Sequence, residues 1–228
     1  MELVVFDLDG VLFDSGELVV ESVALAVERL RAETGLPLPM PPRERIFALM
    51  GTPNREYARG LGLDLTEGQY RRFGALVGEA EVELIRAGHG APHDGIPELV
   101  NRLVDRGVRL AVASNCGRPY LLEFLDRFEL ADAFAIALCN DDCPSGDKVD
   151  LLQMALEHQE VLASEAVYLG DRGRDEAAAR DVGLGFLACT WGFGDDAEFS
   201  PGAARAASPA EAGHILERLL DVGSGQAD

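Results

Sequence analysis

From residue 97 onward, the sequence alternates helical and strand-like segments without interruption. Four strand-like runs, each separated from the next by a helical pattern, lie at residues 108–113, 133–138, 166–169 and 185–189. Such alternation predicts βαβ units on a parallel sheet. The apolar run at residues 3–8 ends in acids and a glycine, which is typical of a buried parallel strand that leads into a loop. We therefore predict an α/β fold with a doubly wound parallel sheet, whose ligands lie beyond the carboxyl ends of the strands.

The segment between the first strand and the alternating half is almost wholly helical. Apolar residues recur every three or four positions in its two longest helical stretches, residues 18–34 and 66–87. Three glycines and a proline then make residues 88–95 a linker. The pattern predicts two units: an α/β core at residues 1–15 and 89–228, and an inserted helical unit at residues 16–88.

The charge balance excludes several classes of partner. The chain has 40 Asp and Glu against 20 Lys and Arg, a net charge of −20, so it repels nucleic-acid phosphates and anionic lipid. No apolar run approaches the ~20 residues of a membrane span. The four cysteines form no CxxC pair, and the N-terminus lacks the basic region of a signal peptide. We expect a cytoplasmic protein with no nucleic-acid or membrane partner.

Two acids follow the first predicted strand. Asp7 and Asp9 are two positions apart in extended chain, so both carboxylates face one small space, where they need a cation or a shared proton. An ordinary turn rich in Asp and Gly has the same composition. The four residues Asp7 to Gly10 alone therefore fit a functional site and an ordinary turn equally well. A calcium loop fits less well, because Val11 and Leu12 stand where an EF-hand needs an acid and a glycine.

Polar residues also stand at the other strand ends and at the starts of the helices beside them. These residues are Ser114, Asn115, Lys148, Asp171 and Asp175. Each one alone is typical of a turn, a solvated lysine or an acidic helix cap. Together with the first two acids, they converge at one edge of the sheet. Oxygen ligands without a His or Cys pattern indicate Mg²⁺, and Mg²⁺ beside a lysine and an amide suits phosphoryl transfer.

Four segments of the sequence resemble the motifs of the haloacid dehalogenase superfamily of phosphotransferases. They are DLDGVLFDS at residues 7–15, SN at 114–115, Lys148, and GDRGRD at 170–175. The helical insert is similar to the cap of the branch that contains phosphoglycolate phosphatase and β-phosphoglucomutase. The resemblance covers residues 3 to about 192. It implies a Rossmann-like core in which the first strand is central, with a cap domain that closes over the active site.

The resemblance also implies a role for each residue. Asp7 would be the nucleophile that forms an aspartyl-phosphate, and Asp9 the general acid–base. Mg²⁺ would be held by the acids of the first and last motifs, namely Asp7, Asp9 through its carbonyl, Asp171 and Asp175. The phosphoryl group would contact polar side chains of the two middle motifs, Ser114, Asn115 and the catalytic Lys148.

The sequence departs from the branch at two places. Val149 follows Lys148 where related proteins usually have proline, which affects the expected placement of the lysine. The loop GTPNRE at residues 51–56 falls where related caps carry their specificity loop, but it matches no particular enzyme. Arg55 is the one cation in that loop, and we expect it to bind a substrate anion or to be an ordinary solvated arginine. The segment Trp191 to Phe193 resembles the segment after the last strand in this branch, and we expect it to anchor packing.

These observations predict a Mg²⁺-dependent phosphatase that hydrolyses a small phosphomonoester through an aspartyl-phosphate. The same residues would serve a sugar-phosphate mutase, which returns the phosphate to a second hydroxyl. A catalytically silent binding protein is a third alternative, which the retention of all four acids disfavours. The expected partner is a small-molecule phosphate ester, and the expected assembly is a monomer or a homodimer.

Overall fold

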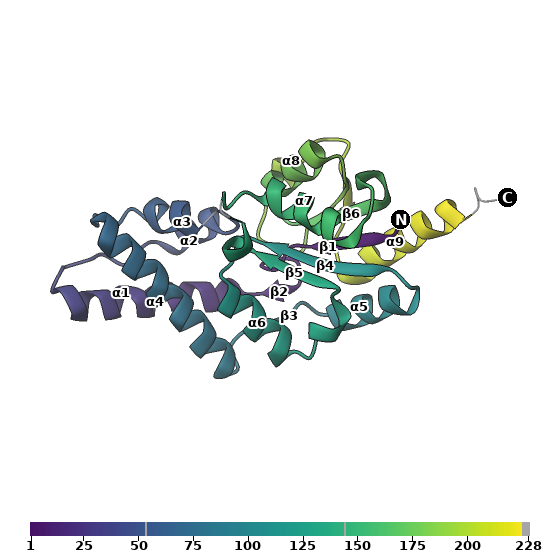
Figure 1. Cartoon of the computed structure of the whole chain (residues 1–228). Coiled ribbons are helices and arrows are strands. Elements are labelled where there is room, and N and C mark those ends of the chain that lie inside the picture. The colour runs from purple at the N-terminus through teal and green to yellow at the C-terminus, as the bar shows by residue number, and fades with distance from the viewer. Residues whose placement is uncertain (53, 144, 225–228) are drawn as a thin grey trace.

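The computed structural model describes residues 1–52, 54–143 and 145–224, and its centre is a parallel sheet (Figure 1). Six strands follow the order β5-β4-β1-β6-β7-β8, and every neighbouring pair is parallel. Their bounds are β1 Leu3–Phe6, β4 Arg109–Ser114, β5 Ile136–Cys139, β6 Ala166–Gly170, β7 Gly185–Cys189 and β8 Ala204–Ala206. The predicted fold class and the central place of β1 are confirmed.

Helices cover both faces of this sheet. On one face lie α5 (Ile96–Asp105), α6 (Arg118–Arg127) and α9 (Pro209–Ser224); on the other lie α7 (Lys148–Gln159) and α8 (Gly173–Val182) (Figure 1). Val4 and Phe6 of β1 pack toward the first face, and Leu3 and Val5 toward the second. All four are fully buried, which explains why this strand is a continuous apolar run rather than an alternating one.

Along the sequence, four further helices come between the first strand and the remaining strands of the sheet. They are α1 (Gly16–Thr34), α2 (Arg43–Leu49), α3 (Asn54–Gly60) and α4 (Glu67–Arg86), and α1 packs along α4. Gly35 ends α1 in the left-handed conformation (φ 73°), and Thr66 with Gln69 forms a capping box that begins α4. No helix among the described residues is long and apolar enough to span a bilayer.

Three short strands were missed by the sequence pattern. The linker contains β3 (Ala91–Pro92), which pairs antiparallel with β2 (Phe13–Asp14) and brings the two ends of the helical segment together. The sheet also has a sixth strand, β8, beside β7. Ladders of two or three residues are too short to establish an alternating pattern, so periodicity does not reveal them.

Phe13 is the centre of an aromatic cluster beneath the first loop. Its ring centroid lies 4.8 Å from that of Phe124, 5.9 Å from that of Phe128 and 6.0 Å from that of Tyr120. The Phe13 side chain is fully buried. Since β2 follows the acidic loop directly, this cluster fixes the loop against α6.

Replacing Phe13 with alanine should lower the free energy of unfolding by about 3–5 kcal/mol, because it deletes a buried ring and leaves a cavity. Urea denaturation followed by circular dichroism measures the loss. Leu122→Ala is the control, because Leu122 is 52% exposed on α6 and should change stability by less than about 0.5 kcal/mol. Equal losses in the two variants would contradict a structural role for the aromatic cluster.

Candidate active site

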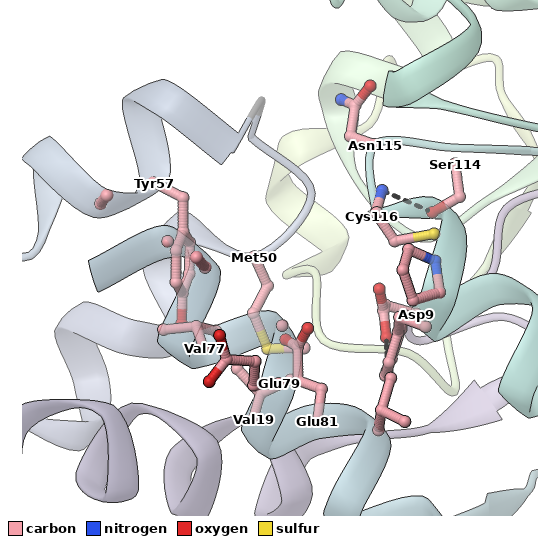
Figure 2. Close-up of a pocket in the computed structure, with 18 of the residues that line it drawn as sticks. Asp9, Val19, Met50, Tyr57, Val77, Glu79, Glu81, Ser114, Asn115 and Cys116 are labelled. Atoms are coloured by element: carbon pink, nitrogen blue, oxygen red, sulfur yellow. Dashed lines mark hydrogen bonds between the residues drawn. The ribbon is translucent and has the colours of Figure 1, made fainter. Parts of the chain in front are cut away.

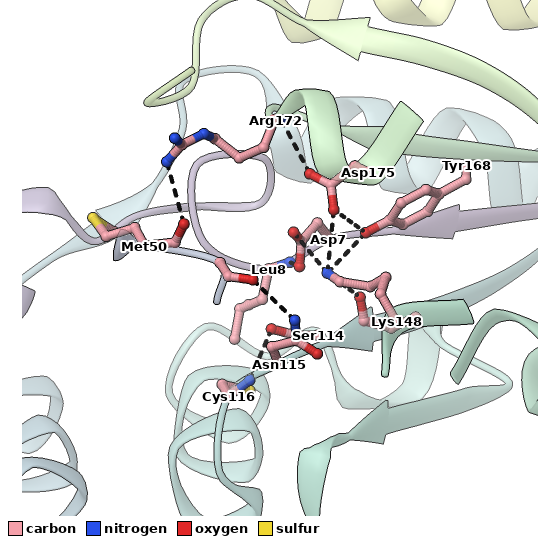
Figure 3. Close-up of polar contacts among 12 residues, drawn as sticks. Asp7, Leu8, Met50, Ser114, Asn115, Cys116, Lys148, Tyr168, Arg172 and Asp175 are labelled. Atoms are coloured by element: carbon pink, nitrogen blue, oxygen red, sulfur yellow. Dashed lines mark hydrogen bonds and ion pairs between the residues drawn. The ribbon is translucent and has the colours of Figure 1, made fainter. Parts of the chain in front are cut away.

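Predicted site residues meet at the carboxyl edge of the sheet. Asp7 follows β1 directly, Ser114 is the last residue of β4, and Asp171 follows β6. Because β4 and β6 are the two neighbours of β1, the three positions are adjacent in space. Lys148, the first residue of α7, reaches the same place (Figure 3). The structure thus brings together side chains that are up to 164 positions apart in the sequence.

Lys148 is buried at the centre of this group. Its Nζ lies 2.9 Å from Asp7 Oδ2 and 3.5 Å from Asp175 Oδ1. It also donates to the carbonyl oxygen of Ala113 at 3.2 Å and to Tyr168 Oη at 2.9 Å. Burial alone would lower the pKa of Lys148, but the charges of Asp7 and Asp175 outweigh it and raise this pKa above its usual value. The lysine is therefore held as a cation with its position fixed from four sides.

The valine that replaces the usual proline after Lys148 does not displace the lysine. Unlike proline, Val149 has a backbone N–H that the first turn of α7 leaves without a helical partner. Asp147 precedes the helix, and its Oδ1 accepts that N–H at 3.0 Å. The chain thus compensates locally for the departure from the family pattern.

The carboxylates around Lys148 carry more negative charge than one ammonium neutralises. Oxygens of Asp7, Asp171 and Asp175, all buried, lie within 4.8 Å of one another. Burial raises the pKa of Asp7 to about 6, with Asp175 adding to the rise and Lys148 opposing it. Burial and the charges of Asp175 and Asp7 also raise the pKa of Asp171 well above its usual range. Among the described residues, this cluster of hard oxygen donors fits a divalent cation.

The start of α8 holds Asp175 in place. The backbone N–H of Arg172 donates to Asp175 Oδ2 at 3.0 Å, and Tyr168 Oη donates to Asp175 Oδ1 at 3.2 Å. The Tyr168 hydroxyl contacts both Asp175 and Lys148. Besides their direct ion pair at 3.5 Å, the two charged groups are therefore linked through this buried phenol (Figure 3).

The segment after β7 packs against the first loop and α2, and it also donates a hydrogen bond to a site carboxylate. Trp191 Nε1 donates to the carbonyl oxygen of Val11 at 3.1 Å, and the ring of Phe193 lies 5.6 Å from that of Phe47. The expectation of a packing anchor is thus incomplete, because the backbone N–H of Phe193 also donates to Asp171 Oδ2 at 2.7 Å. Gly10 (φ 80°) lies against the same carboxylate, and a Cβ there would collide with it.

Asp9 has different partners from Asp7. Ser15 Oγ and Tyr120 Oη both donate to Asp9 Oδ1, each at 2.6 Å. Burial raises the pKa of Asp9 above its usual range, although these two donors oppose the rise. No described residue donates to Asp9 Oδ2. That oxygen is therefore available to carry a proton to or from a bound molecule.

A cavity of about 680 Å³ opens in front of these acids (Figure 2). Asp7, Asp9, Ser114 and Asn115 line it from the sheet, and α4 lines it from the opposite side. Ser114 is buried, and its Oγ accepts the backbone N–H of Cys116 at 3.3 Å, which leaves its own proton for a ligand. The cavity thus lies between the sheet edge and the helical segment.

Asn115 connects the sheet edge to the loop after α2. Its Nδ2 donates to the carbonyl oxygen of Gly51 at 2.9 Å, while its buried Oδ1 has no partner among the described residues. Arg172 makes a parallel contact, because its Nη1 donates to the carbonyl oxygens of Phe47 and Met50, each at 3.2 Å. Arg55 belongs to α3, but its side chain lies outside the described part of the structure, so its predicted role stays a prediction.

Three contact residues were missed by the sequence analysis. They are Ser15 and Tyr120, which hold Asp9, and Tyr168, which joins Lys148 to Asp175. Tyr168 had a signal, since it is a polar-tipped residue in an otherwise apolar strand of sequence AVYLG. Tyr120 had none, because its role depends on a residue 111 positions away.

The parallel sheet carries buried acids and a buried lysine at its carboxyl edge, beside a cavity. These features define an α/β protein with a charged ligand site at its strand ends. Comparison with protein families gives the specific assignment. The chain belongs to the haloacid dehalogenase-like hydrolase family, whose model matches residues 4–189. The family resemblance carried by the four motifs is thereby confirmed.

The relatives include a kinase and phosphatases. The tyrosine-protein kinase PtkA of Mycobacterium tuberculosis is 31% identical over 194 residues, which are 85% of this chain and 63% of that protein. The chain thus spans less than two thirds of PtkA. The phosphoglycolate phosphatase of Pseudomonas savastanoi pv. phaseolicola is 27% identical over 203 residues, which are 84% of this chain and 70% of that protein.

Solved structures agree with the fold. A predicted phosphoglycolate phosphatase from Haemophilus somnus matches with a TM-score of 0.83 at 19% identity, over 95% of this chain and 98% of that chain. CbbY from Rhodobacter sphaeroides, solved in complex with phosphate, matches with a TM-score of 0.81 at 24% identity, over 93% of this chain and 98% of that chain. At these identities, the likeness establishes the α/β architecture.

The raised pKa of Asp7 predicts how the stability of the metal-free protein depends on pH. Because its pKa is 3.8 ordinarily and about 6 in the fold, the stability that it contributes is present below pH 4 and is lost as pH rises through 6. The loss should reach about 2–3 kcal/mol of unfolding free energy, and Asp7→Asn should abolish it. Urea denaturation in EDTA between pH 4 and 7 measures the difference.

Asp132→Asn, a change at an exposed acid of the 3₁₀ helix Ala131–Ala133, is the control and should keep the pH dependence of the wild type. If the free energy of unfolding of Asp7→Asn depended on pH as steeply as that of the wild type and this control, the pKa of Asp7 would not be raised in the fold.

Proposed function

We propose that this protein is a Mg²⁺-dependent phosphatase that hydrolyses a small phosphomonoester through an aspartyl-phosphate on Asp7. The observation that carries the proposal is the difference between two carboxylates that line one cavity. Asp7 is paired with a buried ammonium, and Asp9 is held by two hydroxyls with one oxygen available. Such a pair suits a nucleophile beside a separate acid–base.

In the first step, a carboxylate oxygen of Asp7 attacks phosphorus and the bond from phosphorus to the ester oxygen breaks. Asp9 gives its proton to the departing oxygen, so the alcohol leaves neutral. The raised pKa of Asp9 supports this role, since it keeps a proton available closer to neutral pH.

In the second step, water attacks phosphorus and the bond from phosphorus to Asp7 breaks. Asp9, now ionised, accepts the proton of the water, and inorganic phosphate leaves. Throughout, Lys148, the Ser114 hydroxyl and Asn115 would bind the phosphoryl oxygens. Phosphoryl transfer depends mostly on such positioning and on neutralising charge, and these groups supply both.

The acidic cluster fits Mg²⁺, which supplies positive charge that stabilises the phosphoryl oxygens when it is bound. Its ligands would be Asp7, the carbonyl of Asp9, Asp171 and Asp175. The raised pKa values of Asp7 and Asp171 support this assignment, because they indicate negative charge that the described residues leave unneutralised.

We also propose that residues 16–88 act as a cap on a core formed by residues 1–15 and 89–228. The cavity wall from α4 supports this division, since closure of such a unit would exclude water from the phosphoryl group.

We further propose that the protein is cytoplasmic. Its four free cysteines suit a reducing compartment and support this location.

The family contains proteins with other phosphoryl acceptors. A kinase such as PtkA is named for transfer to tyrosine, and a mutase would return the phosphate to a second hydroxyl of its substrate. All of these reactions can share a first step, so the second step distinguishes them. Release of free phosphate from a simple ester supports hydrolysis, whereas an isomerised sugar phosphate or a phosphorylated tyrosine would support the other two reactions.

The experiment that tests the mechanism traps the intermediate. Asp9→Asn should slow turnover by about 10²–10⁴-fold, because it removes proton transfer. The first step should suffer least with an aryl phosphate, whose leaving group needs no proton. Given a ³²P-labelled aryl phosphate with Mg²⁺, this variant should therefore accumulate label that hydroxylamine removes, and peptide mapping should locate it on Asp7.

Asp7→Asn is the matched control, because it has the same amide exchange two residues earlier and should take up no label. Label on Asp9, on a histidine, or on the Asp7→Asn protein would contradict the assignment of Asp7 as nucleophile.

A further inference from the structure

The end of the cavity away from Asp7 differs in chemistry from the phosphoryl end. Its wall is largely apolar and comes from the helical segment: Val19, Met50, Tyr57, Ala58, Phe73 and Val77. Asp9 and Lys148 stand on the opposite side, at the sheet edge. A leaving group with a substantial apolar stem would be desolvated against this wall.

Helix α4 contributes three acids and one arginine to the cavity lining, and all but one of these four groups form ion pairs. Glu79 lies 2.9 Å from Arg72, and Glu83 pairs with Arg29. Arg86 is the only Lys or Arg among the lining residues that the structure describes, and it lies 2.7 Å from Glu123. Glu81, on the same helix, is the exception.

Glu81 has neither a hydrogen bond nor an ion pair with any described residue, and it is partly buried. It faces the cavity near Asp9 (Figure 2). Burial, followed by the charge of Asp9, raises the pKa of Glu81 to about 8. A carboxyl group in this situation is stabilised as a carboxylate when a ligand brings positive charge to it.

A second polar atom on this wall also lacks a partner. The Oη of Tyr57 is buried and makes no hydrogen bond to any described residue. Burial, followed by the charges of Glu81 and Asp9, raises its pKa. Tyr57 lines the same cavity as both acids. Buried polar groups are nearly always hydrogen-bonded, so the unpartnered Tyr57 hydroxyl, in the same cavity as Glu81, indicates a missing polar ligand group.

We propose that the leaving alcohol of the substrate carries a cationic group, such as a primary ammonium, on an apolar stem, and that Glu81 binds this cation. The inference rests on the proposed phosphatase function and adds a substrate class to it. The phosphate occupies the end near Lys148, and the stem lies along the apolar wall. The ammonium pairs with Glu81 and donates to Tyr57 Oη.

The same geometry disfavours substrates with a second anion. A carboxylate or second phosphate at the remote end would meet Glu81 and, at the described part of the wall, no unpaired cation. Such an anion would be desolvated against the apolar wall without a counter-charge, and it would keep Glu81 from ionising. The protein should therefore discriminate against the anionic ester named in its phosphoglycolate phosphatase relatives.

Three aryl phosphates with one reacting end and different remote charges test the proposal. Tyramine phosphate carries an ammonium, 4-ethylphenyl phosphate is neutral, and the phosphate ester of 4-hydroxyphenylacetate carries a carboxylate. With wild-type protein and Mg²⁺, kcat/KM should be about tenfold higher for the cationic ester than for the neutral one. It should be lowest for the carboxylate ester, with the differences mainly in KM.

Glu81→Gln should reduce the ratio of kcat/KM between the cationic and neutral esters about tenfold, because it removes the charge and keeps the shape. Glu83→Gln is the matched control. It removes one charge two residues away on α4, where Arg29 already pairs with the acid, and should leave the ratio within about twofold. An equal fall in both variants would overturn the assignment to Glu81.

Other outcomes separate this proposal from the proposed function. Hydrolysis of all three esters at similar kcat/KM would overturn the cationic substrate and leave the phosphatase function intact. Preference for the carboxylate ester, lost in Arg55→Ala, would overturn it in favour of anion binding by that arginine. Failure to hydrolyse any of the three would overturn the phosphatase function, and the inference with it.

Discussion

The buried ion cluster of Lys148, Asp7 and Asp175 determines the arrangement of the whole site. Its members come from the start of α7, the end of β1 and the first turn of α8, so the cluster ties both helices of one sheet face to the central strand. Removing one member of such a cluster leaves uncompensated charge and typically costs about 3–5 kcal/mol. The contacts that would position a phosphoryl group are thus also contacts on which the fold depends.

The two ends of the cavity divide the chemistry between two parts of the chain. The sheet edge supplies charged groups whose positions are fixed by strand order, and these suit a reaction common to many phosphate esters. The opposite wall comes from the helical segment, whose side chains take no part in the ion cluster around Lys148. Glu81 on α4 is where we place the choice of substrate.

The sequence predicted the sheet edge well and the opposite wall poorly, for physical reasons. Asp7, Ser114 and Asp171 were predictable because strands of a parallel sheet end at one edge, whichever helices join them. Tyr120 was not, since its contact with Asp9 depends on how α6 packs. Glu81 interrupts the apolar stripe of α4, four residues after Val77, and that interruption was the available signal.

We propose that Asp7, Asp171 and Asp175 form a cation site, because Lys148 leaves part of their negative charge unneutralised. Titration calorimetry of Mg²⁺ near pH 6, in two buffers that differ in ionisation enthalpy, tests this claim most directly. We predict binding of one Mg²⁺ with release of protons, because the pKa values of Asp7 and Asp171 are raised in the metal-free protein. Asp171→Asn should abolish that binding. Absence of binding by the wild type, or equal binding by the variant, would contradict the account.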